Sequence, residues 1–196
     1  MQRVLPASLG PIFTYSDARR HGVSARHLRA WTAEGLIERL DRGLYLRVGR
    51  TTNLLDLELS ELARRTPVAT VCLLSALARH GLSDAIPSRI DVAVPRGHRT
   101  PALHLPIAWH SFARDTFGVG RQELKVAPGL TVGLYDPMRC LVDLFRLRHL
   151  YGADLANEAL RRWLSTPSAR PGQLLTMARL FPKAESALRV SLRVLL

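Results

Sequence analysis

The chain has 196 residues, of which 47% are hydrophobic and 22% are charged, a composition that excludes wholesale disorder. Its two cysteines exclude a disulfide framework and a cysteine-ligated zinc site. The formal net charge of +12 favours nucleic acid as a partner, because a cationic protein concentrates polyanions around it.

The sequence offers no candidate for a membrane segment. Every charge-free run is shorter than the ~20 apolar residues that a membrane-spanning helix needs. Pro6 and Pro11 interrupt the N-terminal stretch, which is therefore a poor match to a signal peptide. We expect a cytoplasmic protein that makes no contact with a membrane.

Two short helices separated by a tight turn are predicted near the N-terminus. Thr14 and Asp17 have the spacing of a capping box, which predicts a helix over residues 15–21. Ser24 is expected to cap a second helix that runs to Glu34. A glycine follows each of these segments, as is typical of helix ends.

A β-hairpin is predicted directly after the second helix. Two apolar runs, residues 36–40 and 44–48, flank a short loop that ends in Gly43. The order helix, turn, helix, hairpin is that of a winged helix-turn-helix, a DNA-binding fold.

The second predicted helix has one apolar face and one basic face. At 100° per residue, Leu28 and Trp31 lie on one side and are expected to pack on the core. Small residues and arginines lie opposite them; small side chains let a helix approach base edges, and arginine grips guanine through two hydrogen bonds. The alternative for any single arginine is that it only solvates a small helix. The residues that we expect to contact DNA are Ser24, Arg26, His27, Arg29 and Ala30 on the helix and Arg39, Arg42 and Arg47 on the hairpin.

Several short motifs in this region form a recognisable series. They are Phe13-Thr14, Gly22-Val23-Ser24, Leu28, Glu34-Gly35-Leu36 and Arg42-Gly43-Leu44-Tyr45. Together they resemble the N-terminal winged-helix domain of AbiEi-family antitoxins, and the Arg-Gly-x-Tyr motif of the wing is the most specific among them. The resemblance implies that this domain binds the promoter of its own operon.

The rest of the chain is predicted to form a second, α+β domain with a small mixed sheet covered by helices. The first domain is expected to span residues 1–49, a linker residues 50–53, and the second domain residues 54–196. Helices are predicted over residues 53–65, 69–80, 137–149, 154–164, 171–180 and 184–195, and strands over 89–94, 103–105, 108–112 and 130–135. Arg139, Asp143 and Arg146 have the spacing of ion pairs along one helix, and Cys72 is expected in the core.

This second half also resembles AbiEi proteins, though more loosely. The matching stretches include Ser75-Ala76-Leu77, His80-Gly81-Leu82, the strand at 89–94 and the Asp136-Pro137 helix start. The resemblance implies that the second domain neutralises a nucleotidyltransferase toxin of the AbiEii type. Candidate residues for that role are Arg96, His98 and Arg99, which form a basic turn after a predicted strand; the alternative is a solvated loop.

No catalytic or metal-binding pattern emerges from the sequence. His98, His104 and His110 are spaced six residues apart, but no carboxylate or cysteine joins them to complete a ligand set. The acidic residues lack the paired spacing of a metal-dependent nuclease, and neither a Walker A loop nor a GxGxxG motif is present. We therefore predict that the protein is not an enzyme and uses no cofactor.

These observations favour an antitoxin that represses its own operon. Monomers or weak dimers are expected to pair on an inverted repeat in double-stranded DNA, because specific operators usually contain two half-sites. Two alternatives stay open. One is a free-standing regulator whose second domain senses a small molecule, and the other is an enzyme, such as a nuclease, that the first domain targets to DNA.

Overall fold

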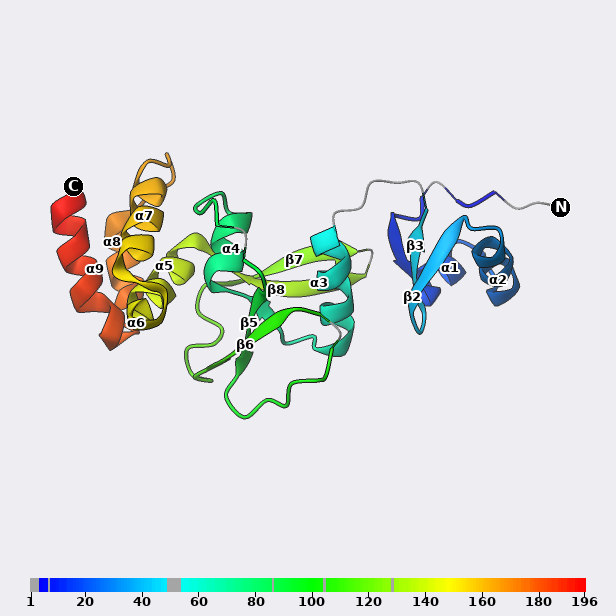
Figure 1. The fold of residues 1–196 in the computed structure, drawn as a ribbon, viewed down its shortest axis with the longest axis horizontal. Helices are drawn as coiled ribbons and strands as arrows, with labels where there is room; N and C mark the ends of the chain where they lie inside the picture. The colour runs from blue at the N-terminus through cyan, green and yellow to red at the C-terminus, as the bar shows by residue number, and fades with distance from the viewer. Residues whose placement is uncertain (1–3, 7, 49–53, 86, 104, 128) are drawn as a thin grey trace. The chain divides into compact units, whose positions relative to one another are not determined.

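The computed structural model describes residues 4–6, 8–48, 54–85, 87–103, 105–127 and 129–196. The chain forms two compact units, Met1–Pro67 with Leu124–Val132 and Val68–Glu123 with Gly133–Leu196. Its architecture is α+β, as predicted (Figure 1). The predicted linker at 50–53 lies outside the described residues, so a domain division there stays a prediction. Within the described residues, no helix is long and apolar enough to cross a membrane.

The first unit begins with a winged helix-turn-helix. Its elements are β1 (Ile12–Thr14), α1 (Tyr15–Arg20), α2 (Ala25–Ala33), β2 (Ile37–Asp41) and β3 (Leu44–Arg47). The strands form an antiparallel sheet in the order β1-β3-β2. The two helices and the hairpin confirm the prediction, whereas β1 was not predicted because three residues are too few to show an alternating pattern.

The capping residues of α1 and α2 act as the sequence indicated. The Thr14 hydroxyl accepts a hydrogen bond from the Asp17 N–H at 3.1 Å, and the Asp17 carboxylate accepts one from the Thr14 N–H at 2.9 Å. Ser24 caps α2 in the same way. Gly22 and Gly35 follow the two helices with φ of 72° and 69°, a left-handed conformation that costs glycine little.

An apolar cluster drawn from all parts of the winged helix forms its core. The buried members are Leu5, Leu9, Phe13, Ala18, Val23, Leu28, Trp31 and Ile37. The ring of Phe13 stacks on that of Tyr45 with centroids 5.7 Å apart. Because Leu28 and Trp31 point into this core, the opposite face of α2 is turned to solvent, as predicted.

The first unit also contains α3 (Leu54–Arg65) and the tip of a hairpin from much later in the chain. A second apolar cluster joins Ile12, Leu44 and Ala127, with Leu40, Leu46 and Leu130 packed against it. Asp41 accepts hydrogen bonds from Arg64 at 3.2 Å and Arg65 at 3.1 Å. A hydrogen bond from the backbone N–H of Arg42, together with these charges, lowers the pKa of Asp41.

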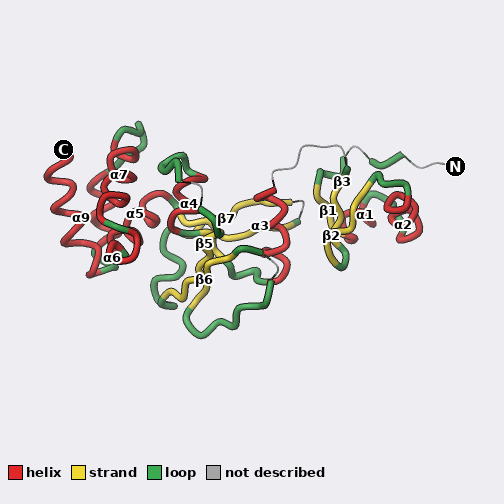
Figure 2. Tube along the Cα trace, viewed as in Figure 1, coloured by secondary structure: helices red, strands yellow, loops and turns green. Residues whose placement is uncertain are grey.

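A five-stranded mixed sheet lies at the centre of the second unit (Figure 2), except that its residues Leu124–Val132 belong to the first unit. Its strands are β4 (Thr70–Val71), β5 (Ile90–Pro95), β6 (Ile107–Phe112), β7 (Arg121–Ala127) and β8 (Leu130–Tyr135), in the order β6-β5-β4-β8-β7. β4 runs antiparallel to β5 and parallel to β8, and β5 runs parallel to β6. The small mixed sheet is therefore as predicted.

Helices complete the second unit, and Figure 1 shows the C-terminal ones gathered beyond one end of the sheet. They are α4 (Leu73–Arg79), α5 (Pro137–Arg146), α6 (Arg148–Tyr151), α7 (Ala153–Leu164), α8 (Pro171–Ala178) and α9 (Pro182–Leu195). As predicted, Asp136 caps α5, since its carboxylate accepts the Arg139 N–H at 2.7 Å. α5 is the central helix, because its residues 139–145 are all buried.

Two helix predictions in this unit are partly wrong. A helix was expected over 69–80, but Thr70 and Val71 form β4 and the helix begins only at Leu73. Pairing with a strand on each side outweighs the helical pattern there. The helix expected over 137–149 ends at Arg146, and α6 follows as a separate turn.

One strand prediction is wrong, and one strand was not predicted. Leu103 and Leu105 lie in a loop rather than in a strand, between Pro101 and Pro106. β7 was missed, because its exposed polar residues sit at the edge of the sheet and obscure the alternation that marks a half-buried strand.

Candidate nucleic-acid interface

The exposed face of α2 has the properties of a helix that reads DNA. Leu28 and Trp31, 1% and 4% exposed, hold the helix on the core. Arg26, Arg29 and Ala30 lie on the exposed face. Neither guanidinium group pairs with a carboxylate among the described residues, so both are free to donate hydrogen bonds to base edges or phosphates.

Two of the predicted contact residues, Ser24 and His27, form the N-terminal cap of α2. The backbone N–H of Ser24 donates to Nδ1 of His27 at 3.2 Å, and the Ser24 Oγ lies 2.9 Å from the same nitrogen. The His27 ring also packs against Trp31, with centroids 5.9 Å apart. His27 therefore orients the start of the helix, while Arg26, Arg29 and Ala30 remain exposed.

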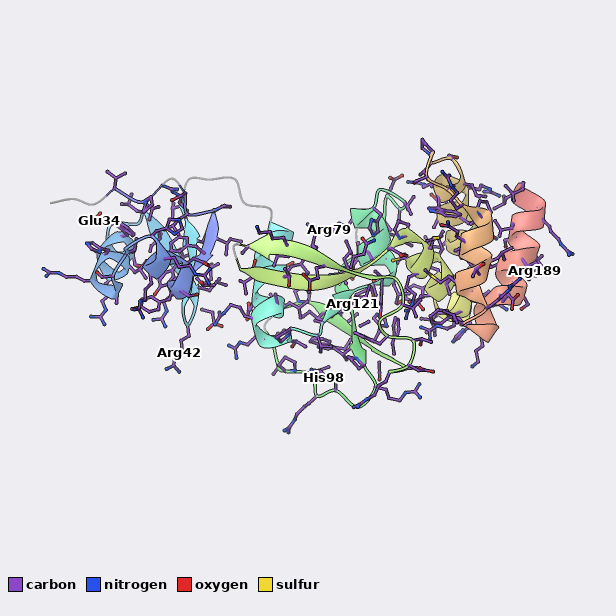
Figure 3. All side chains as sticks on the ribbon, turned by 180° about the vertical axis from the view of Figure 1, so that it is seen from behind. Glu34, Arg42, Arg79, His98, Arg121 and Arg189 are labelled. Atoms are coloured by element: carbon purple, nitrogen blue, oxygen red, sulfur yellow. The ribbon has the colours of Figure 1, made fainter. Side chains whose placement is uncertain are left out.

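The wing presents a second basic element. Arg42 is exposed, and Figure 3 shows its side chain extending away from the tip of the β2–β3 hairpin. The adjacent Gly43 has φ of 78°, which allows the tight turn that presents Arg42. Arg39 is also exposed, and its Nε donates to the backbone carbonyl of Asp41 at 3.3 Å.

Arg47, the remaining predicted contact, binds the protein's own backbone. Its guanidinium donates to the carbonyls of Leu5 at 2.9 Å, Pro6 at 3.3 Å and Leu9 at 3.5 Å. These bonds tie the segment before β1 to β3. A contact between Arg47 and DNA stays a prediction, but the geometry gives this residue a structural role of its own.

Replacing Arg47 by alanine is therefore expected to destabilise the winged helix by about 1–3 kcal/mol, because hydrogen bonds from a charged donor are lost. The measurement is urea unfolding followed by the fluorescence of Trp31, with Trp109 and Trp163 replaced by phenylalanine. Arg39→Ala is the matched control, and we expect a change within about 0.5 kcal/mol for this exposed side chain. Equal effects of the two substitutions would show that the carbonyl contacts contribute nothing.

The winged helix is similar to a known protein family. Residues 4–48 match a family model described as "Transcriptional regulator, AbiEi antitoxin". The N-terminal segment of the chain matches the AbiEi antitoxin family. The match covers the AbiEi winged helix alone and supports a role as an antitoxin or transcriptional regulator.

The similarity in fold extends beyond the AbiEi segment. The crystal structure of the RV2827C protein from Mycobacterium tuberculosis superposes with a TM-score of 0.52 over 94% of this chain and 76% of that one, at 18% sequence identity. At this identity the likeness concerns the fold alone. None of the curated proteins compared with the chain matches it.

The basic turn of the second unit lies outside the AbiEi segment. Arg96, His98 and Arg99 are exposed, and Gly97 between them has φ of 82°. The backbone N–H of His98 donates to the backbone carbonyl of Pro95 at 2.9 Å, which closes a turn directly after β5 (Figure 3). The turn thus presents its cations to solvent, and their role in neutralising a toxin stays a prediction.

The predicted ion pairs of α5 are present and lie in the interior. Arg139 Nε contacts the Asp143 carboxylate at 2.9 Å, and Arg146 contacts its other oxygen at 2.8 Å. The side chains of Arg139 and Asp143 are fully buried. Burial raises the pKa of Asp143, and the two guanidinium groups oppose that rise.

Aromatic rings and backbone carbonyls complete the surroundings of Arg139. Its guanidinium lies 4.2 Å from the ring centre of Tyr135 and 4.5 Å from that of Phe181. It also donates to the carbonyls of Thr116 at 2.6 Å and Val119 at 2.7 Å. Arg139 therefore joins the loop before β7 to helix α5 and to the start of α9, which is a structural role.

Several groups suited to enzymatic chemistry are paired or buried. His110 pairs with Asp91 at 2.8 Å, and His104 lies outside the described residues. No cluster of metal-ligating side chains occurs among the residues that the structure describes. Cys72 and Cys140 are buried, and burial raises the pKa of both thiols, which keeps them protonated.

The residues around a cavity in the second unit were not predicted from sequence as a site. Its lining includes Trp109, Arg146, His149 and Lys183, with Arg96 as the one member that had been singled out as a candidate binding residue. These residues come from β6, the α5–α6 junction and the start of α9, and only tertiary packing brings them together. The i, i+3 spacing of Arg146 and His149 was the single local signal.

Proposed function

We propose that the protein is an antitoxin that represses transcription of its own operon through the winged helix. The observation that carries this proposal is the exposed arginine and alanine face of α2, opposite its buried Leu28 and Trp31. The AbiEi match over residues 4–48 supports the same role. Such a protein acts in the cytoplasm, where the promoter is.

In this proposal α2 enters the major groove. Arg26 and Arg29 donate to base edges, while Ala30 lets the helix approach closely. Arg42 and Arg39 on the wing hold the neighbouring phosphates, which fixes the position of the helix but adds no sequence information. Two protomers bind the two halves of an inverted repeat.

Fluorescence anisotropy on DNA from upstream of the gene tests the DNA-binding role. Arg26→Ala is expected to weaken binding to this duplex by about 1–3 kcal/mol and to relax base preference, whereas Arg42→Ala should weaken binding to all sequences about equally. Arg193→Ala, which removes an exposed arginine from α9, is the control for lost charge and should change little.

Two outcomes would contradict the proposal. Binding that is equal on an unrelated duplex and disappears at moderate salt would reduce the interaction to a polyelectrolyte effect of the +12 charge. Equal losses for Arg26→Ala and Arg193→Ala would show that α2 does not read the groove.

The second unit, in the same proposal, neutralises a nucleotidyltransferase toxin through its basic surface. The exposed turn with Arg96, His98 and Arg99 is the candidate contact, because a cationic loop complements an active site that binds nucleotide and metal. Co-expression with the product of the neighbouring gene tests this. Rescue of growth by the intact chain, and its loss when the three residues are replaced by alanine, is expected. A chain that gives no rescue would exclude the antitoxin role.

A second candidate is a free-standing regulator whose second unit senses a small molecule. The cavity in that unit favours this candidate, because its volume of about 660 Å³ lies within the usual range of small-molecule sites, about 300–1,000 Å³. A neighbouring gene whose product is not toxic would favour it over the antitoxin.

A further inference from the structure

The cavity in the second unit combines an apolar wall with a cluster of cations. Its apolar lining includes Trp109, Leu150 and Leu180. Leu150 is 69% exposed and Leu180 is 54% exposed, although both are large and apolar. A single exposed leucine needs no explanation, but two beside a tryptophan at one cavity form a surface suited to a flat, weakly polar ring.

The cations of the cavity outnumber its carboxylates. The cations Arg96, Arg146 and Lys183 line it together with the imidazole of His149, whereas Asp115 is the only carboxylate among the lining residues. The side chains of His149 and Lys183 are exposed and pair with no carboxylate among the described residues. An anionic group is therefore the complementary ligand.

A second hollow of about 390 Å³ continues from the cavity and is lined by polar and charged residues alone. It is lined by Arg146, Arg148, His149, Lys183 and Ser186, and it shares Arg146, His149 and Lys183 with the larger cavity. The larger cavity thus offers an apolar wall, and the hollow next to it offers guanidinium, ammonium, imidazole and hydroxyl groups carried on their aliphatic stems. A ligand that fills both has a flat body at one end and several negative charges at the other.

A buried cluster of ion pairs next to Arg146 adds positive electrostatic potential to the cavity. Arg139 and Arg146 share the single carboxylate of Asp143, so this cluster carries one more positive charge than negative. Nε of Arg146 is buried and has no hydrogen-bond partner among the described protein atoms.

The N-terminus of helix α9 also adds positive electrostatic potential to the cavity. The helix begins beside Phe181, where no side chain caps it, so the positive end of its dipole lies next to Phe181 and Lys183 of the cavity wall.

We propose that the two hollows together bind one nucleoside triphosphate. The base lies against Trp109 and the exposed leucines, and the phosphates lie over Arg146, His149 and Lys183. Inorganic phosphate alone leaves the apolar wall unused. The acidic side chains of a peptide carry no flat ring for the wall, and their single charges are spaced more widely than those of a triphosphate. This ligand site shares none of its residues with the DNA contacts proposed above, and it shares Arg96 with the proposed toxin contact.

Calorimetric titration of the full-length protein with ATP and with GTP tests the proposal, in about 0.15 M salt so that loose ionic attraction is screened. We expect at least one nucleotide to bind with a Kd below about 0.1 mM. Adenosine or guanosine, which lacks the phosphates, and inorganic tripolyphosphate, which lacks the base, are each expected to bind at least about tenfold more weakly.

Variants then assign the binding to this site. Lys183→Ala should weaken nucleotide binding at least about tenfold, while Arg193→Ala, which removes an equal charge from the same helix, should leave it unchanged. Trp109→Leu should weaken nucleotide binding but not tripolyphosphate binding. Arg26→Ala on the winged helix should affect neither. Circular dichroism should show that each variant is folded.

Several results would overturn the proposal. They are no binding of either nucleotide, tripolyphosphate binding as tight as ATP binding, and equal losses for Lys183→Ala and Arg193→Ala. A glutamate-rich peptide that displaces ATP and binds more tightly would also overturn it and would assign the hollows to an acidic segment of a protein.

Discussion

Replacement of Asp143 by asparagine is expected to lower the free energy of unfolding of the second unit by about 3–5 kcal/mol. Asp143 is the shared anion of two guanidinium groups, at 2.9 Å from Arg139 and 2.8 Å from Arg146. Asparagine preserves the shape of the side chain but removes its charge, which leaves a fully buried cation at Arg139 without a counter-ion. Such a stranded charge costs more than the ion pair itself contributes.

Urea unfolding followed by the fluorescence of Trp109 and Trp163 measures this effect, in a Trp31→Phe background that silences the first unit. Glu123→Gln, at an exposed carboxylate on β7, is the isosteric control and should change stability by less than about 0.5 kcal/mol. Arg139→Met combined with Asp143→Asn should cost less than the sum of the single substitutions by about 0.5–3 kcal/mol, since the two groups are in contact. An Asp143→Asn variant as stable as the control would refute the role of the cluster.

Gly120→Ala is expected to destabilise the second unit by about 2–5 kcal/mol, from two separate causes. Gly120 has φ of 70°, a conformation that costs an L-residue about 1–2 kcal/mol. A Cβ at this position would also lie 2.6 Å from Cβ of Arg139 and 3.1 Å from the Asp136 carboxylate. Relief of that clash requires a shift of backbone or of a buried side chain, which costs about 1–3 kcal/mol.

Gly118→Ala provides the matched control for Gly120→Ala. Gly118 belongs to the same loop, has no left-handed φ, and a Cβ there meets nothing within 4 Å. We expect its thermal unfolding midpoint to stay near that of the parent chain, while Gly120→Ala lowers it clearly. If both variants unfold at the same temperature, the close approach of the loop to α5 is not required for stability.

The winged helix could be predicted from sequence because its signals are local. The Thr14–Asp17 spacing, the serine cap of α2 and the apolar pair Leu28 and Trp31 each act within a few residues, and the structure confirms all of them. The hydrogen bonds from Arg47 to the carbonyls of Leu5, Pro6 and Leu9 could not be predicted, because they span about forty positions of sequence.

The second unit was less predictable because long-range pairing decides its elements. Thr70 and Val71 were predicted to belong to a helix, but in the structure they pair with β5 on one side and β8 on the other. The Arg139–Asp143–Arg146 spacing predicted ion pairs correctly, but spacing alone does not reveal burial. The cavity residues come from separate elements, so no sequence pattern could have predicted that they line one cavity.

The make-up of the first unit has a consequence for synthesis on the ribosome. Its second apolar cluster needs Ala127 and Leu130, which the ribosome adds long after Ile12 and Leu44. At about 5–20 residues per second, the nascent winged helix waits several seconds with this apolar face uncovered. During that interval the newly made N-terminal region offers a surface to chaperones, or to another nascent chain, that the finished protein keeps covered.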